Sequence, residues 1–271
     1  MSSYLKTIDA SKPAPVSAET VTNISYGSHP EQKMDIYLPA NRTTSSTKVL
    51  ITIHGGGLNS GDKSDLEAHV DTLRKRLPGY AIFNINYRLA RNAGSAFPTL
   101  ENDVKAAFQS IYNRPSDYSI SDKYVLLGIS AGAHLALLQG YKYSTPVKPK
   151  AIVSFFGPTD LTDMYNNPGN PYVPYALLSV TGKTPLQDSL LYTNSSPVNF
   201  VSNSSPSTII LHGGLDPLVK SSQSFALINK LKSAGVNNQI VFYATEGHGW
   251  YGLNLVDSFN KIENFLSTNV N

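Results

Sequence analysis

The sharpest chemical signal in the sequence is a serine flanked by small residues, Gly128-Ile129-Ser130-Ala131-Gly132. It follows an apolar run, Tyr124 to Leu127, and precedes a helical pattern, as expected for a nucleophile on a tight strand-to-helix turn. Glycines two positions away on each side are needed there, because larger side chains would collide with the adjoining strand and helix. Ser130 would also lie at the positive end of a helix, which favours an anionic tetrahedral intermediate.

A serine hydroxyl is a poor nucleophile near neutral pH, so a histidine must accept its proton and a carboxylate must orient that histidine. His248 is the best base, because it lies in a loop just after the last predicted strand. Asp216 is the preferred acid, because it follows another predicted strand and gives the chain order Ser, Asp, His. Asp160 also follows a strand, but it is better placed to N-cap a short helix.

The other five histidines are assigned no catalytic role. His54 and His134 lie in a glycine loop and in the helix after the serine, where packing or loop support is the expected role. His212 lies at a strand end and is also expected to be structural. His29 and His69 are predicted to be surface residues.

A second motif, His54-Gly55-Gly56-Gly57, comes directly after the apolar run Val49 to Ile53. Consecutive glycines expose backbone N–H groups, and a loop at this point can reach the same sheet edge as the serine. Those donors, together with the amide of Ala131, would stabilise the oxyanion that forms during acyl transfer. Such a donor is typically worth about 3 kcal/mol.

The rest of the chain alternates short apolar runs with helical patterns, which predicts an α/β protein. The predicted strands are Val21 to Tyr26, Lys33 to Tyr37, Val49 to Ile53, Ala81 to Ile85, Tyr124 to Gly128, Ala151 to Phe155, Thr208 to Leu211 and Gln239 to Tyr243. The predicted helices are Asp65 to Leu77, Leu100 to Tyr112, Ala131 to Gly140, Ser222 to Ala234 and Val256 to Leu266. We expect a mostly parallel sheet of about eight strands, with an antiparallel start and helices on both faces.

One domain over residues 1–271 is the expected organisation, because a large α/β sheet absorbs this length without a second core. Residues 1–18 are predicted to form a flexible lead. Tyr165 to Ser205 is rich in Pro, Asn, Tyr and Ser and is longer than ordinary connections. We expect it to form a small cap or lid insertion.

The composition excludes several classes of protein. The net charge is +3 without a long run of Lys and Arg, so no nucleic-acid partner is expected. The absence of cysteine excludes disulfides, thiolate metal sites and a cysteine nucleophile. No apolar segment is long enough to span a bilayer, so we expect a soluble chain, cytoplasmic or exported with a leader removed. Its oligomeric state is left open.

Taken together, the motifs resemble the α/β-hydrolase superfamily, and within it the esterases similar to the hormone-sensitive-lipase family. The resemblance covers nearly all of residues 20–270 and is carried by His54-Gly55-Gly56-Gly57, Gly128-Ile129-Ser130-Ala131-Gly132, His212-Gly213-Gly214-Leu215-Asp216-Pro217 and Gly247-His248-Gly249. It implies that Gly56, Gly57 and Ala131 supply the oxyanion hole. The chain also resembles compact bacterial carbohydrate-ester esterases, which include acetylxylan and feruloyl esterases.

These residues predict a serine carboxylesterase that forms an acyl-enzyme on Ser130 and needs no metal or organic cofactor. The expected substrate is a short-chain ester, either a small molecule or an acetyl or feruloyl ester of plant carbohydrate. Leu58 and Trp250 are the candidate substrate-binding residues. The carbohydrate-ester esterases that the chain resembles often carry a bulky aromatic residue just after the glycine loop, whereas this chain has Leu58 and Asn59 there. An arylformamidase-like or peptidase-like hydrolase is the alternative within the same fold. A non-catalytic binding module would have no reason to keep the full set of residues.

Overall fold

The structure, a computed structural model, describes residues 16–90 and 97–271. Within these ranges, eight strands form one sheet in the order β1-β2-β4-β3-β5-β6-β7-β8. The strands are β1 (Glu19–Ser25), β2 (Lys33–Leu38), β3 (Lys48–Ile53), β4 (Tyr80–Ile85), β5 (Tyr124–Ile129), β6 (Ala151–Phe155), β7 (Ser207–Gly213) and β8 (Asn238–Tyr243). β2 runs antiparallel to both β1 and β4, whereas the later pairs are parallel. The predicted mostly parallel sheet with an antiparallel start is confirmed.

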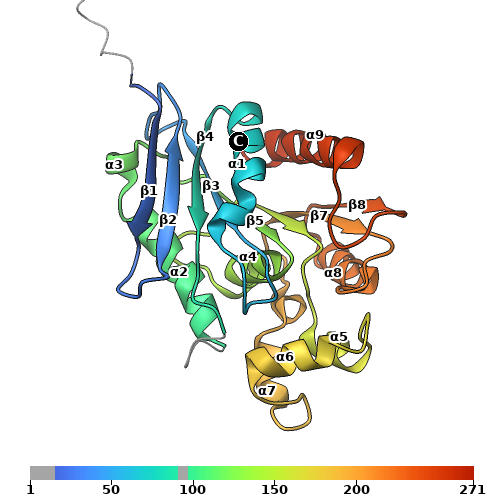
Figure 1. Ribbon diagram of the computed structural model, residues 1–271. Coiled ribbons are helices and arrows are strands. Elements are labelled where there is room, and N and C mark those ends of the chain that lie inside the picture. Colours follow the sequence, from blue (N-terminus) through green and yellow to red (C-terminus); the bar gives the residue numbers. More distant parts are fainter. Residues whose placement is uncertain (1–15, 91–96) are drawn as a thin grey trace, which may run out of the picture.

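Helices cover both faces of this sheet (Figure 1). α1 (Glu67–Arg76) and α9 (Gly252–Asn269) pack on one face. The other face is covered by α2 (Thr99–Tyr112), α4 (Ala131–Lys142) and α8 (Ser221–Ser233). Together with the strand order, this is the α/β-hydrolase architecture that the motifs imply.

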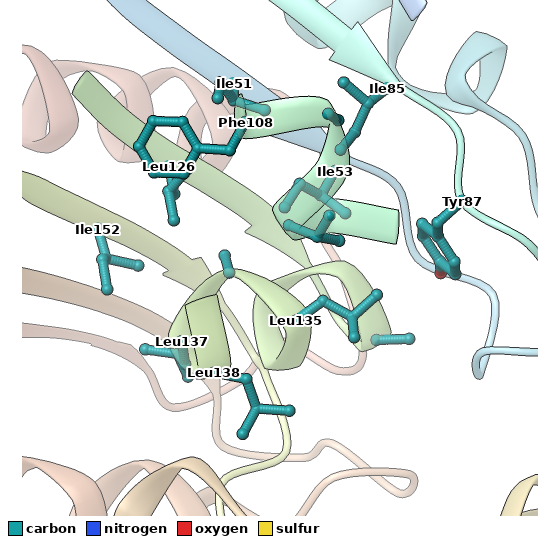
Figure 2. Packing of buried hydrophobic residues seen from close by; sticks show 14 of the residues in the cluster. Ile51, Ile53, Ile85, Tyr87, Phe108, Leu126, Leu135, Leu137, Leu138 and Ile152 are labelled. Carbon is teal, nitrogen blue, oxygen red and sulfur yellow. The ribbon is translucent and has the colours of Figure 1, made fainter. Parts of the chain in front are cut away.

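Each face of the sheet has its own hydrophobic core. Along β5, Leu126 belongs to the cluster under α2 and α4, whereas Val125 and Leu127 belong to the cluster under α1 and α9. Figure 2 shows part of the first cluster, with Phe108 of α2, Leu126 of β5 and three leucines of α4 labelled. A strand buried on both faces needs apolar residues on each side of its pleat. This is why β3 to β7 read as nearly continuous apolar runs.

The connection from β6 to β7 carries its own helices, at the bottom of Figure 1. They are α5 (Leu161–Asn166), α6 (Val173–Thr181), α7 (Ser189–Asn194) and the short η2 (Pro197–Phe200). We call residues 157–206 the helical insertion; its first helix begins before the predicted start of the cap. Asp160 N-caps α5 by accepting the N–H of Asp163 at 3.0 Å, the role expected for it. Of the predicted flexible lead, residues 1–15 lie outside the described residues.

Several boundaries differ from the prediction for local reasons. The predicted helix Asp65 to Leu77 is divided into a 3-10 turn, η1 (Lys63–Leu66), and α1. It begins earlier than predicted, because Asp62 and Asp65 form a capping box at the start of η1. α9 begins four residues before the predicted Val256, at a glycine that apolar periodicity does not mark. A short helix, α3 (Pro115–Tyr118), carries too few apolar residues to be recognised from periodicity.

Candidate active site

Ser130 sits on a strained turn between β5 and α4. Its φ of 54° and ψ of −118° belong to neither a strand nor a helix, and its N–H donates to the carbonyl of Phe155 at 2.8 Å. A Cβ at Gly128 would collide with the carbonyl of Gly132, and one at Gly132 would collide with the carbonyl of Ile53. Both motif glycines are therefore required because backbone from α4 and β3 crosses the turn closely.

The structure brings Ser130, His248 and Asp216 into one hydrogen-bonded chain. Nε2 of His248 lies 2.9 Å from Oγ of Ser130, and Nδ1 of His248 lies 2.7 Å from Oδ2 of Asp216. A carboxylate only accepts, so Nδ1 carries the proton and Nε2 accepts from the serine hydroxyl. The three residues follow β5, β8 and β7, whose carboxyl ends meet at one edge of the sheet. This arrangement can activate a serine for attack on a carbonyl group.

Both oxygens of the Asp216 carboxylate accept hydrogen bonds. Oδ1 accepts the N–H groups of Leu218 at 2.8 Å and Val219 at 2.9 Å. Burial raises the pKa of this carboxyl, but hydrogen bonds from His212, His248 and Val219 outweigh it and hold the pKa well below its usual range. Asp216 is therefore ionised at neutral pH and can stabilise a positive charge on His248.

His212 has a larger part in the site than the sequence indicates. It is completely buried, and its Nε2–H donates to the carbonyl of Val219 at 2.8 Å and lies 3.4 Å from Oδ2 of Asp216. Its Nδ1 accepts from the hydroxyl of Ser224 on α8 at 2.6 Å. The His212 ring thus connects the loop that contains Asp216 to α8. In the sequence, the only signal for this role is the position of His212 at the end of β7.

Hydrogen bonds within the glycine loop are accepted by its carbonyl groups, and its N–H groups point in the opposite direction. The carbonyl of Gly56 accepts the N–H of Ser60 at 3.0 Å and its hydroxyl at 2.8 Å. The carbonyl of Gly55 accepts Nδ1–H of His54 at 2.8 Å. In a planar trans peptide, the N–H points opposite to the carbonyl, so the N–H groups of Gly56 and Gly57 face away from these partners.

His54 and Tyr87 support this loop from below. Their rings stack with centroids 4.4 Å apart, and the hydroxyl of Tyr87 donates to the carbonyl of His54 at 3.2 Å. Burial lowers the pKa of His54, so the ring stays neutral at neutral pH. The loop-support role expected for His54 is therefore the one its contacts describe.

Ala131 completes the set of candidate oxyanion donors. It is the first residue of α4, so its N–H has no carbonyl one turn earlier within the helix to bond. Ala131, Gly56 and Gly57 line the same cavity as Ser130 and His248. The residues that the sequence assigned to nucleophile, base and oxyanion hole thus meet around one space.

This cavity has a volume of about 550 Å³, within the usual range for small-molecule sites. Its lining includes residues of both core clusters, and we divide most of it by position in the chain into two groups, which we call arms. The insertion arm consists of Leu161, Met164, Val173, Ala176, Leu177 and Val180. The α1–α9 arm consists of Asp65, Leu66, His69, Trp250, Tyr251 and Leu255.

The two candidate substrate-binding residues both line this cavity. Leu58 follows the glycine loop with a φ of 66° and is buried. Trp250 lies among aromatic rings, 5.4 Å from Phe156 and 4.9 Å from Tyr243 between centroids. Its indole N–H donates to Ser258 at 2.9 Å. Packing therefore occupies most of the Trp250 side chain, and only part of it borders the cavity.

The surface position predicted for His69 is wrong. His69 lies on the face of α1 that is turned to the sheet, with its ring 5.8 Å from that of Phe259 and 6.4 Å from that of Phe155. Burial lowers its pKa. Apolar periodicity assigns α1 a narrow inward stripe of Val70 and Leu73, and it does not show that His69 borders the same side.

His134 is fully buried one turn after Ser130. Its Nδ1–H donates to the carbonyl of Pro158 at 3.1 Å, and burial lowers its pKa to about 4. Across residues 16–90 and 97–271, side chains of His, Cys, Asp and Glu form no group of three that could hold a metal ion. In the same ranges, every helix is too short or too polar to cross a bilayer.

Comparisons with known proteins agree on the family of this chain. A profile of the BD-FAE family matches residues 34–231. Esterase LipC of Mycobacterium tuberculosis is 22% identical over 246 residues, which cover 86% of this chain and 60% of LipC. Esterase LipQ of the same organism is 28% identical over 198 residues, which cover 69% of this chain and 46% of LipQ. The chain thus spans only about half the length of these curated relatives.

Solved structures share the fold. A truncated carbohydrate esterase from gut microbiota superposes with a TM-score of 0.80 at 24% identity, over 93% of this chain and 96% of that protein. A thermophilic esterase from Thermogutta terrifontis superposes with a TM-score of 0.75 at 19% identity, over 93% of this chain and 92% of that protein. At such identities, the likeness shows a common α/β-hydrolase fold.

Proposed function

The chain belongs to the BD-FAE family, and from this premise we propose that it is a carboxylic ester hydrolase that works through a Ser130-His248-Asp216 triad. The observation that carries the proposal is the hydrogen-bonded chain of these three side chains, of which Ser130 and His248 line the cavity. Esterases among its relatives and structural neighbours support the same reaction class.

The mechanism is acyl transfer in two steps. Oγ of Ser130 attacks the ester carbonyl while Nε2 of His248 takes its proton, and the oxyanion is held by the N–H groups of Gly56, Gly57 and Ala131. His248 then gives the proton to the departing alcohol. A water molecule, activated by the same imidazole, releases the acid and restores Ser130. Asp216 orients the imidazole and stabilises its charge throughout.

The acyl group is short, and the insertion arm receives it. All six residues of this arm are apolar, and four of them belong to the core cluster under α2 and α4. An apolar wall binds a hydrocarbon chain by removing it from water. The carbohydrate esterase among the structural neighbours supports acetyl or feruloyl esters of carbohydrate as the natural substrates.

The test is hydrolysis of 4-nitrophenyl acetate, butyrate, octanoate and laurate by the wild type and by Ser130→Ala, with a feruloyl ester and acetylated xylan alongside. We expect activity to fall with chain length and to vanish in Ser130→Ala. Ser154→Ala is the matched control, because Ser154 is a buried serine on the neighbouring strand β6 whose hydroxyl has no partner among the described residues. Undiminished activity of Ser130→Ala would contradict the proposal.

A further inference from the structure

The α1–α9 arm differs in chemistry from the apolar insertion arm. It lies toward the opposite face of the sheet, since Leu66 and Trp250 belong to the core cluster under α1 and α9. Its floor is apolar, but three of its residues, Asp65, His69 and Tyr251, carry polar groups. These three residues belong neither to the proposed triad nor to the proposed oxyanion hole.

Two of these polar groups have hydrogen-bonding capacity left over. Nδ1 of His69 is buried and has no partner among the described residues. Oδ2 of Asp65 accepts the N–H of Asp62 at 3.0 Å, whereas Oδ1 has no partner within the described part of the chain. Asp65 lies in η1 and His69 lies in the first turn of α1, and both line the cavity. Nε2, the other ring nitrogen of His69, also has no hydrogen bond among the described residues, and it is not enclosed as Nδ1 is. Asp65 is exposed at the cavity wall. Oδ1 of Asp65 and Nε2 of His69 are therefore the atoms that a ligand in the cavity can bond.

Tyr251 adds an aromatic surface beside the same arm. Its side chain is 87% exposed, although the preceding Trp250 is buried. Glycines flank the pair Trp250-Tyr251, with Gly249 at φ 103° and Gly252 at φ 63°. They let the backbone turn, so the two side chains can point in different directions. Burying so large an exposed ring against a ligand would remove considerable apolar area from water.

The position of His248 decides which part of an ester enters this arm. The departing alcohol oxygen must lie within reach of Nε2 of His248, because that atom returns the proton. From His248 the chain continues through Gly249 into Trp250 and Tyr251, which belong to the α1–α9 arm. We therefore assign the alcohol part of the ester to this arm and the acyl part to the insertion arm.

We propose that the α1–α9 arm is a subsite for a hydroxyl-rich alcohol, namely a sugar ring that bonds to Asp65 and His69 and packs on Tyr251. Sugar hydroxyls both donate and accept, which matches a carboxylate that only accepts and a neutral imidazole that does both. The ring C–H face matches the aromatic surface of Tyr251. This inference rests on the proposed function and assigns the side of the site that selects the alcohol.

The experiment compares two esters with the same acyl group. Methyl β-xyloside monoacetate carries free hydroxyls on its alcohol part, whereas 4-nitrophenyl acetate carries none. The quantity measured is the ratio of kcat/KM for the sugar ester to kcat/KM for the aryl ester. We expect Asp65→Asn, His69→Phe and Tyr251→Ala each to lower this ratio by about tenfold, the loss typical of one good hydrogen bond or ring contact.

The variants are chosen to keep the fold. The amide oxygen introduced by Asp65→Asn can still accept the N–H of Asp62, and His69→Phe keeps an aromatic ring against Phe259. Tyr251→Phe should restore most of the ratio lost in Tyr251→Ala, because it retains the ring. Asp71→Asn on α1 and Tyr175→Ala on α6 are matched controls, since both side chains are exposed and lie outside the cavity wall. We expect the wild-type ratio in both controls.

Each outcome separates this inference from the proposed function. If the wild type cleaves 4-nitrophenyl acetate in a Ser130-dependent way but not the xyloside acetate, the subsite is wrong and the esterase stands. An unchanged ratio in Asp65→Asn, His69→Phe and Tyr251→Ala has the same meaning. Hydrolysis of both esters that persists in Ser130→Ala would instead contradict the proposed function itself.

Discussion

Replacing Asp216 by asparagine removes the negative charge beside His248 and leaves the side-chain size almost unchanged. The hydrogen bonds of the acid decide how the new amide turns. Its oxygen takes the place of Oδ1, because that position accepts the N–H groups of Leu218 and Val219. The NH₂ group then donates to Nδ1 of His248, which forces the imidazole proton onto Nε2. In that tautomer, His248 cannot accept the proton of Ser130.

The magnitude follows from this change of tautomer. An imidazole in the wrong tautomer lowers kcat by about 10⁴-fold, which corresponds to about 5 kcal/mol of activation free energy. The same NH₂ group also faces Nε2–H of His212, which lies 3.4 Å from Oδ2 in the wild type. Two donors facing each other in a buried site should lower the free energy of unfolding of Asp216→Asn by about 1–3 kcal/mol.

The assay is steady-state hydrolysis of 4-nitrophenyl acetate, with urea unfolding followed through Trp250, the single tryptophan of the chain. Asp160→Asn is the matched control, because Asp160 is the rival carboxylate of the sequence and asparagine N-caps a helix as well as aspartate does. We expect the control to keep the wild-type kcat. Retention of more than about a tenth of kcat by Asp216→Asn, or an equal loss in Asp160→Asn, would refute the reasoning.

Three further predictions concern the cavity, the serine turn and pH. Ala176→Trp should fill the insertion arm and lower the ratio of octanoate to acetate hydrolysis by about tenfold or more, whereas Ser179→Trp, on the same helix but outside the cavity wall, should leave it unchanged. Gly132→Ala should lower the free energy of unfolding by more than about 3 kcal/mol, because its methyl group meets the backbone of β3; Gly79→Ala, with open space around its Cβ, should be tolerated in the same urea titration. The folded-state pKa of His134, about 4, lies below the ordinary 6.5, so its neutral form contributes fully above pH 6.5 and this contribution is lost as the pH falls toward 4. His134→Gln should therefore reduce the loss of stability between pH 7 and pH 4 by up to about 3 kcal/mol, and an unchanged pH dependence would contradict this.

Local patterns in the sequence were enough to identify the candidates for the chemistry and the class of the fold. Apolar runs such as Val49 to Ile53 indicate strands buried on both faces, because each side of the pleat needs an apolar residue there. Gly128 and Gly132 around Ser130 indicate a tight turn, because close backbone contacts exclude a Cβ at both positions. These signals are local, so they can be read without knowledge of the neighbouring elements.

Which of these candidates meet depends on the packing of the folded chain. Asp216 and Asp160 both follow strands, and only the packing of the β7 and β8 loops places Asp216 at 2.7 Å from His248. The contacts of His212 and His69 likewise depend on residues that are distant in the chain or belong to another helix. Spacing along the sequence carries little information about such contacts, because they arise where separate elements meet at one edge of the sheet.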